Sequence, residues 1–323
     1  MTVGRLVYLF YFKPVALVQQ SIREGGPVNQ IITRWGRRAM RRAALRLSPA
    51  DEAPASPQQP YEVHVLTGQK FWYQTAFCLR SLIAQARPIN IIPVFYDDGT
   101  LAEHRQILAC IFPNHRFVSK AEVHERLETH LPKGRFPFLR ERWENYPNIR
   151  KLIDPHLSSS GWKLVLDSDM LFFRRPDFLL DWCARPRRPL HMIDMEESYG
   201  YPRPLLERLA GAPIPERLNV GLCGLQSAAL DWERIEQWIE NLTRSAGTHY
   251  YLEQALVAMI VAGQECAVAT PDDYHTWPTP EEAAMPNAVM HHYVAESKIS
   301  YFRYGWKACL RRMIEENSKF IAT

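Results

Sequence analysis

Two aspartates separated by one residue, Asp167 and Asp169, are the residues whose type and spacing best suit a chemical role. They follow the apolar run Leu164–Leu166, which predicts a buried strand. Side chains at i and i+2 point to the same face of an extended chain, so both carboxylates can reach one point. A divalent cation such as Mn2+ or Mg2+ would relieve their repulsion and leave coordination positions for phosphate oxygens. Two solvated aspartates in a strand-end turn are the alternative.

The elements before this pair alternate between strand and helix. The predicted strands are 62–66, 89–96 and 116–118, and the predicted helices are 71–85, 101–112, 122–129 and 148–154. This order predicts an α/β fold, in which a mostly parallel sheet is flanked by helices on both faces. Such sheets bind ligands at the carboxyl ends of their strands, so Thr67, Gly68 and Asp97 are candidate nucleotide contacts.

The chain after the aspartates is predicted to complete the same body. The predicted strands are 190–194, 218–225, 267–269 and 288–293, and the predicted helices are 228–244, 250–262 and 302–319. Between the first two of these strands lies the loop 195–217, which contains two tyrosines and four prolines.

Four stretches, in chain order, resemble the motifs of GT-A nucleotide-sugar glycosyltransferases, closest to the family-eight-like retaining enzymes. They are Val165–Leu171 with Asp-x-Asp, Leu218–Leu225 with Asn-x-Gly, Tyr250–Leu256 with Glu-Gln, and Val289–Lys298 with a late His. The resemblance covers roughly residues 61–298. It implies a GT-A (Rossmann-like) fold and a metal-dependent transfer of a hexose from a nucleoside diphosphate sugar, with UDP as the expected nucleotide.

The resemblance also implies roles for individual residues. The expected ligands of Mn2+ or Mg2+, which would bridge the donor diphosphate, are Asp167, Asp169 and His292. The expected donor contacts, together with the strand-end residues, are Ser168, Lys298 and either Arg150 or Lys151. The residues expected to orient the sugar are Asn219, Glu253, Gln254 and Asp194. For Glu253 an acidic first turn of a helix, favoured by the helix dipole, explains the residue equally well.

The late segment departs from the family pattern. Ala295 stands where the family has glycine, and Ile299-Ser300 stands where it has Pro-Trp. The resemblance favours retention of anomeric configuration, whereas inversion would require a carboxylate base beside the acceptor. The candidates for such a base are Asp194, Glu196, Glu197 and Glu253. Both stereochemical outcomes therefore stay open.

Three other functions fit parts of the pattern. A haloacid-dehalogenase-type phosphatase also uses Asp-x-Asp after a strand, but it usually continues with Gly-Thr or Gly-Val, and this chain continues with Met170-Leu171. A sugar nucleotidyltransferase would need more glycine than Thr67-Gly68-Gln69-Lys70 provides. A catalytically inactive binding or scaffold protein on the same fold is the third alternative, and the departure at Ala295 keeps it open.

Positive charge is concentrated at the N-terminus. The whole chain has a net charge of +4, yet residues 1–50 hold nine Lys and Arg against one acid. We expect a basic helical arm at 1–47, a Pro/Ala/Ser linker at 48–60 and a GT-A domain at 61–323. Residues 30–47 predict a basic amphipathic helix that either packs one stripe on the domain or contacts an anionic membrane. Nucleic acid is not an expected partner, because no reading motif or aromatic interleaving accompanies the arginines.

The cysteines and the apolar runs bear on location. The six cysteines are scattered and form no Cys-x-x-Cys pair, which favours a reducing cytoplasm. The apolar run Val3–Phe12 is too short to span a bilayer. We therefore expect a cytoplasmic protein, with peripheral membrane contact through the arm as an open alternative.

A membrane-peripheral enzyme would suit an acceptor such as a cell-envelope glycan or a lipid-linked sugar. The expected acceptor side is the loop 195–217, which contains Tyr199 and Tyr201.

Overall fold

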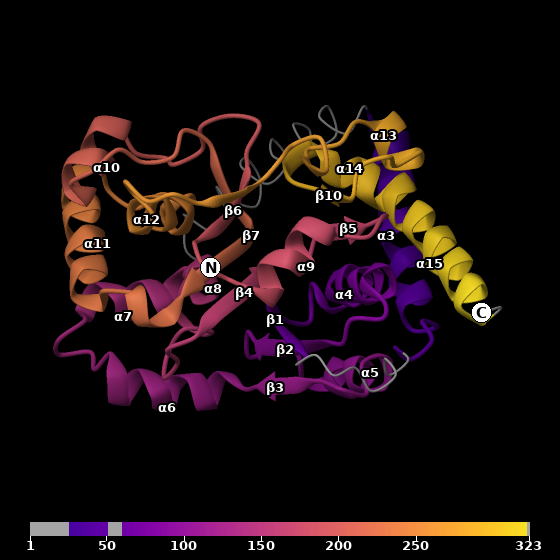
Figure 1. Ribbon diagram of the computed structural model, residues 1–323, viewed down its shortest axis with the longest axis horizontal. Helices are drawn as coiled ribbons and strands as arrows, with labels where there is room; N and C mark the ends of the chain where they lie inside the picture. The colour runs from indigo at the N-terminus through magenta and orange to yellow at the C-terminus, as the bar shows by residue number, and fades with distance from the viewer. Residues whose placement is uncertain (1–25, 51–59, 322–323) are drawn as a thin grey trace, which may run out of the picture.

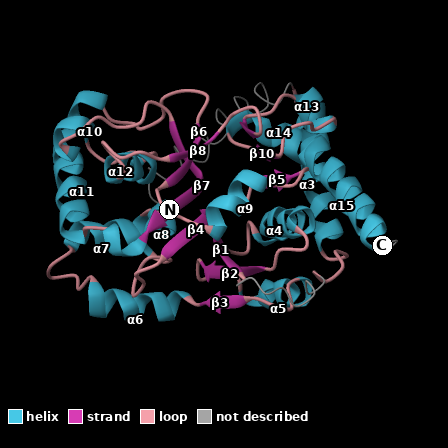
Figure 2. Ribbon diagram, in the orientation of Figure 1, coloured by secondary structure: helices cyan, strands magenta, loops and turns pink. Residues whose placement is uncertain are grey.

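The computed structural model describes residues 26–50 and 60–321, in which a seven-stranded and a three-stranded sheet are surrounded by helices (Figures 1 and 2). The large sheet has the order β3-β2-β1-β4-β7-β6-β8. Its strands are β1 (Tyr61–Thr67), β2 (Ile91–Asp97), β3 (Arg116–Val118), β4 (Trp162–Leu166), β6 (Leu190–Ile193), β7 (Leu218–Gln226) and β8 (Ala267–Ala269). Only β7 runs antiparallel to its neighbours β4 and β6. The predicted α/β fold with a mostly parallel sheet flanked by helices is therefore confirmed.

Helices cover both faces of this sheet because its strands are apolar on both sides. In β2, Phe95 belongs to one core and its neighbours Val94 and Tyr96 belong to the other. The helices that contribute to the Phe95 core are α3 (Pro27–Ala44), α4 (Trp72–Ala86), α5 (Ala102–Ile111), α9 (Asp177–Ala184) and α15 (Trp306–Ile321). Those that contribute to the Val94 core are α6 (Lys120–His130), α7 (Pro137–Asn145), α8 (Arg150–Ile153), α10 (Arg203–Ala210), α11 (Trp232–Ala246) and α12 (Leu252–Ile260).

The small sheet carries His292 of the candidate site. It consists of β5 (Met170–Phe172), β10 (Met290–His292) and β9 (Tyr274–Thr276), in the order β5-β10-β9. The remaining elements are η2 (Pro147–Ile149), η3 (Ser227–Ala229), α13 (Pro280–Ala284), η4 (Ala295–Ser297), α14 (Lys298–Ser300) and the π-helix η5 (Tyr301–Gly305). β5 follows β4 after a three-residue turn, so the chain leaves the large sheet and enters the small one at the two aspartates.

Several short elements were not predicted from the sequence, among them α7, α9, α10, α13, α14, β5 and β9. β5 is a fully buried run of three residues, which is too short to show a period. The helices α7, α10 and α13 each carry proline in the first turn, a position that suits the start of a helix as well as a loop.

The basic helix α3 packs on the body of the protein. Thr33, Met40 and Ala44 form its buried stripe, and α3 lies against α4 and η5. Residues 1–25 of the predicted arm and 51–59 of the predicted linker lie outside the described residues, so the division into arm, linker and domain stays a prediction. Within the described part of the chain, no helix is both long and apolar enough to cross a bilayer.

Candidate functional site

The two aspartates occupy the turn between the two sheets. β4 pairs with both β1 and β7, which fixes its carboxyl end in the middle of the large sheet. The backbone N–H of Asp167 then donates to the carbonyl oxygen of Gly221 at 2.7 Å, and the carbonyl oxygen of Asp169 accepts from the N–H of Tyr293 at 3.0 Å. The turn is thus held by the large sheet on one side and by the small sheet on the other, which sets the direction of both carboxylates.

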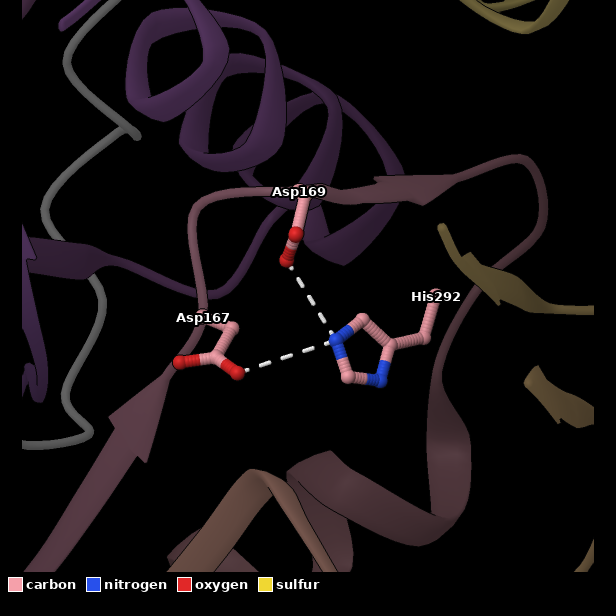
Figure 3. Close-up of side chains that lie close together, drawn as sticks. All are labelled: Asp167, Asp169 and His292. Atoms are coloured by element: carbon pink, nitrogen blue, oxygen red, sulfur yellow. Dashed lines mark ion pairs between the residues drawn. The ribbon is translucent and has the colours of Figure 1, made fainter. Parts of the chain in front are cut away.

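His292 completes a three-residue cluster with these aspartates (Figure 3). β10 pairs antiparallel with β5, so His292 lies opposite Met170, next to Asp169. Its Nε2 atom lies 3.3 Å from an oxygen of Asp169 and 3.7 Å from an oxygen of Asp167. One ligand atom from each residue falls within 4.8 Å of the others. The sequence-predicted trio is therefore brought together, although His292 lies more than a hundred residues from the two aspartates in the chain.

The donor set of this cluster fits a divalent cation. Two carboxylates and one imidazole are ligands that Mn2+ accepts, and Mg2+ accepts the carboxylates. Both ring nitrogens of His292 are buried, and neither has a hydrogen-bond partner among the described residues. An imidazole that is buried beside two carboxylates without a hydrogen bond is costly unless something else coordinates it. The geometry therefore leaves one nitrogen available to a metal ion between the two carboxylates.

Lys298 places a positive charge beside the cluster. Its Nζ atom lies 3.0 Å from an oxygen of Asp169, and its side chain is 43% exposed. Burial alone would raise the pKa of Asp169, but Lys298 and His292 outweigh it and the pKa is lowered. The charge of Asp169 in turn raises the pKa of Lys298. Lys298 is consequently a fixed cation at the edge of the cluster that still has access to a bound anion.

A second cation, Lys151, holds Asp167 and Glu253 and is more deeply buried than Lys298. Its Nζ atom lies 2.7 Å from an oxygen of Asp167 and 3.3 Å from an oxygen of Glu253. Burial raises the pKa of Glu253 to about 7, with Lys151 opposing this shift. Of the two basic candidates on this segment, Lys151 reaches the aspartates. Arg150 instead donates to Asp154 and to the carbonyl oxygen of Asp97.

Three polar side chains form the opposite wall. The amide nitrogens of Asn219 and Gln254 both donate to the same oxygen of Asp194, at 3.0 Å and 3.3 Å. Gln254 also donates to the carbonyl oxygen of Ser198 at 3.0 Å. Asp194 directly follows β6, Asn219 lies in β7 and Gln254 lies in α12, so packing of the body fixes this arrangement before any ligand binds.

These groups line one cavity of about 610 Å³. The sequence-predicted residues that line it are Lys151, Asp167, Asp169, Asp194, Asn219, Glu253, Gln254, His292 and Lys298. Thr67, Gly68, Asp97, Arg150 and Ser168 do not belong to this lining. The Thr67 hydroxyl bonds to that of Thr75 at 2.8 Å, and Asp97 accepts from the N–H groups of Gly99 and Leu101. As nucleotide contacts these five residues stay predictions.

Aromatic residues that were not singled out from the sequence surround the mouth of the cavity. Tyr146, Tyr250, Tyr251 and Trp277 all line it, and Tyr250, Tyr251 and Trp277 are exposed. Trp277 has a φ of 64°, a left-handed conformation that is strained for a bulky side chain. The sequence offered no usable signal for Trp277, because the short strand β9 that it directly follows was itself not predicted.

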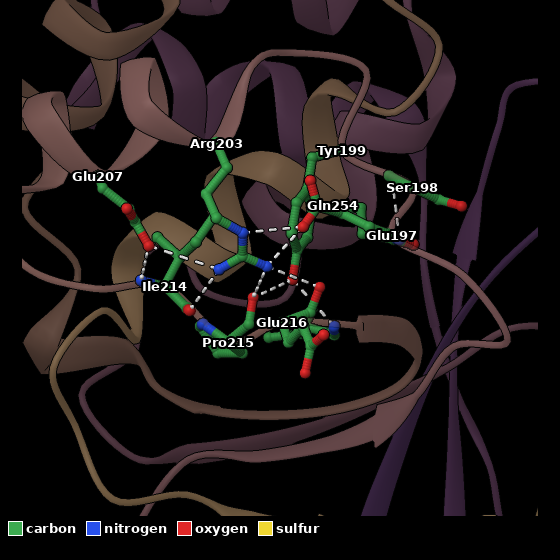
Figure 4. Close-up of polar contacts among 10 residues, drawn as sticks. Glu197, Ser198, Tyr199, Arg203, Glu207, Ile214, Pro215, Glu216 and Gln254 are labelled. Carbon is green, nitrogen blue, oxygen red and sulfur yellow. Dashed lines mark hydrogen bonds and ion pairs between the residues drawn. The ribbon is translucent and has the colours of Figure 1, made fainter.

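The loop 195–217 is fixed by internal bonds (Figure 4). Both of its tyrosines are buried. Arg203 lies 2.5 Å from Glu197 and donates to the carbonyl oxygens of Ile214 and Glu216. Tyr199 is 1% exposed and its hydroxyl bonds to backbone groups at the far end of the loop. Tyr199 and Tyr201 are therefore packing residues, while Met195 and Ser198 at the start of the loop reach the cavity.

Gly221 is expected to be irreplaceable at the cluster. A Cβ atom added there would lie 2.3 Å from Cε1 of His292 and 2.7 Å from the methyl carbon of Met170. We expect Gly221→Ala to displace His292 and to weaken Mn2+ binding by one to two orders of magnitude, as supporting groups of metal sites typically do (about 10–100-fold). Isothermal titration with Mn2+ measures the change. Gly134→Ala is the matched control, since nothing lies within 4 Å of a Cβ atom there. Equal Mn2+ affinity in both variants would contradict this placement of His292.

Comparisons with known proteins identify the fold. The sequence matches no protein-family model and no curated protein. The structure is similar to that of apo mouse xyloside xylosyltransferase 1, with a TM-score of 0.51 and 11% identity, covering 73% of this chain and 98% of that one. It is similar to galactosyltransferase LgtC in complex with donor and acceptor sugar analogues, with a TM-score of 0.51 and 15% identity, covering 79% and 95%.

A third similar structure is that of the apo bifunctional glycosyltransferase WbbM, with a TM-score of 0.50 and 12% identity, covering 82% of this chain and 53% of that one. At such low identities the likeness establishes the fold and not the reaction. The expected GT-A fold is confirmed: this chain has the fold of the GT-A glycosyltransferases.

Proposed function

We propose that this protein is a metal-dependent glycosyltransferase that moves a hexose from a nucleoside diphosphate sugar, with UDP as the nucleotide, to an acceptor. The observation that carries the proposal is the shared cavity of Asp167, Asp169 and His292, with Lys298 at its edge. An acidic pair, an imidazole and an adjacent ammonium suit a metal-bound diphosphate, whose negative charge grows as the sugar leaves.

Asp167, Asp169 and His292 would hold Mn2+ or Mg2+, and such an ion, when bound, supplies charge stabilisation for the leaving diphosphate. The ammonium of Lys298 would contact the same phosphates, because it lies beside Asp169 and remains half exposed. Asn219 and Gln254 already share Asp194 as an acceptor, so they present a rigid polar wall to the sugar hydroxyls. Lys151 keeps the charges of Asp167 and Glu253 compensated.

We further propose a retaining reaction of the family-eight-like type. Asp194 is occupied by two amide donors and Glu253 by Lys151, which favours positioning roles for both over that of a free base. Glu196 is an exposed carboxylate in the same cavity and is the group that inversion would use. The anomeric configuration of the first product, read by proton NMR coupling constants, decides the question. An inverted product would reject retention.

The acceptor is proposed to be a sugar, either of a cell-envelope glycan or of a lipid-linked intermediate, bound at the aromatic mouth. Tyr250, Tyr251 and Trp277 present ring surface there, and such rings combine an apolar face with a polar edge that suits sugars. A cytoplasmic location is part of the proposal. All six cysteines lie in the described residues and are free, as in a reducing compartment.

Joint stabilisation by nucleotide and metal tests the function. We expect UDP and Mn2+ together to raise the melting temperature by more than the sum of the separate shifts, because each completes the binding site of the other. Saturation at a hundred times Kd corresponds to about 2.7 kcal/mol, which is several degrees for a chain of this size. A hydrolysis screen over nucleotide sugars with Mn2+ then identifies the donor. Absence of any shift with every nucleotide, with or without Mn2+, would overturn the proposal.

The same experiment separates the alternatives. An inactive binding protein on this fold would show the joint shift without donor hydrolysis. A phosphatase would release phosphate from simple monoesters and would show no preference for a nucleotide. Two observations favour the transferase over a phosphatase in which Asp167 would act as nucleophile. The chain has the GT-A fold, and the carboxylate of Asp167 is already ion-paired with Lys151 at 2.7 Å.

A further inference from the structure

The outer face of α3 carries a row of exposed apolar side chains. Val28, Ile31 and Trp35 follow the i, i+3, i+7 spacing that places residues on one face of a helix, and they are 69%, 49% and 68% exposed. Ile32 extends the row and is 46% exposed. Large apolar residues are seldom left exposed in such a contiguous group without a binding role.

The opposite face of α3 is locked to the body, so this row cannot turn inward. A Cβ atom added at Gly36 would lie 2.0 Å from the carbonyl oxygen of Phe302, which shows how closely α3 approaches η5. Arg303 donates to the hydroxyl of Thr33 at 2.9 Å and to the carbonyl oxygen of Asn29 at 2.7 Å. The helix therefore presents one defined face to the surroundings.

The arginines of α3 fall into two groups that the sequence does not distinguish. Arg37 stacks on Phe302 at 4.5 Å, and Arg41 lies 3.1 Å from His104, so these two belong to the packing. Arg34, Arg38 and Arg42 are exposed, and their guanidinium groups form no hydrogen bond or ion pair with any described residue. No Asp or Glu occurs between residues 26 and 50. Three charges with no counter-charge among the described residues thus flank the apolar row on its own face.

We propose that this face of α3, defined by Val28, Ile31, Trp35 and the three free arginines, is a docking site for an anionic lipid bilayer. Apolar side chains would enter the boundary between headgroups and acyl chains, with tryptophan at the depth it prefers. The guanidinium groups would bind the phosphates of the headgroups. A protein partner would need an acidic patch matched to this row, whereas an anionic bilayer supplies negative charge along its whole surface.

Docking also has a consequence for the cavity. α3 packs on η5, which directly follows α14 and its residue Lys298. The bilayer surface would then lie about one helix diameter, ~10 Å, from η5. If the proposed transferase function holds, this arrangement favours the lipid-linked sugar over the glycan as acceptor. The membrane proposal itself does not depend on the reaction.

Vesicle binding by the full chain tests the proposal. The probes are vesicles of phosphatidylglycerol mixed with phosphatidylcholine, and vesicles of phosphatidylcholine alone. We expect cosedimentation with the first and not with the second, weakening as salt is added. The triple change Arg34→Gln, Arg38→Gln, Arg42→Gln should weaken binding by on the order of a hundredfold, about fivefold per arginine. The double change Ile31→Ser, Trp35→Ser should also release the protein.

Matched controls remove the same groups elsewhere. Arg185→Gln, Arg187→Gln, Arg208→Gln removes three exposed arginines outside α3, and Met285→Ser removes a methionine that is 82% exposed. Both should bind vesicles as the parent does, with all variants melting at the parent temperature.

Binding that survives both sets of α3 changes, equal loss in the controls, or no binding by the full chain would overturn the proposal. A dimer in light scattering that Trp35→Ser dissolves would assign the face to self-association instead. Donor hydrolysis, measured in parallel, reports on the transferase function separately.

Discussion

Replacing Asp169 with asparagine is expected to lower turnover by on the order of 10³-fold while leaving the fold intact. Asp169 is the carboxylate closest to both His292 and Lys298, at 3.3 Å and 3.0 Å. Asparagine keeps the size and one oxygen but loses the negative charge that a cation requires. The fold should survive, because the carbonyl oxygen of residue 169 still accepts the backbone bond from Tyr293.

Turnover with the donor found in the hydrolysis screen measures this effect, and titration with Mn2+ reports binding directly. The control is Asp181→Asn, an exposed aspartate on α9 whose carboxylate lies outside the cavity lining. It should match the parent in turnover and in Mn2+ affinity. Parent-like turnover of the Asp169 variant would reject the metal assignment, even if the variant melts normally.

Replacing Lys151 with methionine is expected to cost about 3 kcal/mol in the free energy of unfolding at about pH 8, measured without metal. Lys151 is the cation between Asp167 and Glu253, and its side chain is 11% exposed. Methionine fills similar space but leaves two carboxylates close together with no cation between them. Breaking a buried ion pair from one side is costly because the remaining charge stays buried and unpaired.

The cost should depend on pH in a defined direction. Burial raises the pKa of Glu253 to about 7 in the folded protein, above its value in the unfolded chain. A group with a raised folded pKa stabilises the fold below the unfolded pKa, and this contribution is lost as pH rises through the folded value. Removing Lys151 raises that folded value further. The destabilisation should therefore shrink as pH falls from about 8 toward about 5, where Glu253 is protonated in the variant.

Urea unfolding of parent and variant in the presence of chelator, at several pH values, measures this trend. Lys163→Met is the matched control: Lys163 is a partly buried lysine whose partner, Glu62, lies 3.8 Å away on the neighbouring strand. Its cost should be small and should change little over the same pH range. A cost at Lys151 that stays constant with pH would show that the residue contributes packing and not charge compensation.

Most elements that the sequence predicted well are long enough to show a period, although the three-residue strands β3 and β8 were also found. The order of β1, α4, β2 and α5 followed from alternating apolar runs, and it implied the parallel half of the sheet. The short elements β5 and β9 carry no such period, and their pairing with β10 is entirely non-local. The small sheet was therefore beyond sequence reasoning, although it is the element that delivers His292 to the aspartates.

The N-terminal helix shows the same division. Its basic and amphipathic character was evident from the sequence, but two faces of one helix were equally available for packing. Contacts with η5 and α5 decided that Arg37 and Arg41 turn toward the body and that Ile31 and Trp35 turn away. Which arginines remain free is a property of that contact and not of the sequence.

By itself the sequence determined the chemistry that is available at Asp167 and Asp169, because residue type and i, i+2 spacing are local properties. It left open whether Arg150 or Lys151 serves them, since neighbours on one short helix point in different directions. The tertiary structure decided for Lys151, turned Arg150 toward Asp154, and placed Trp277 at the mouth of the cavity. The reason is physical: a ligand cluster requires atoms from segments far apart in the chain, and only the packing of two sheets brings them within one ion's reach.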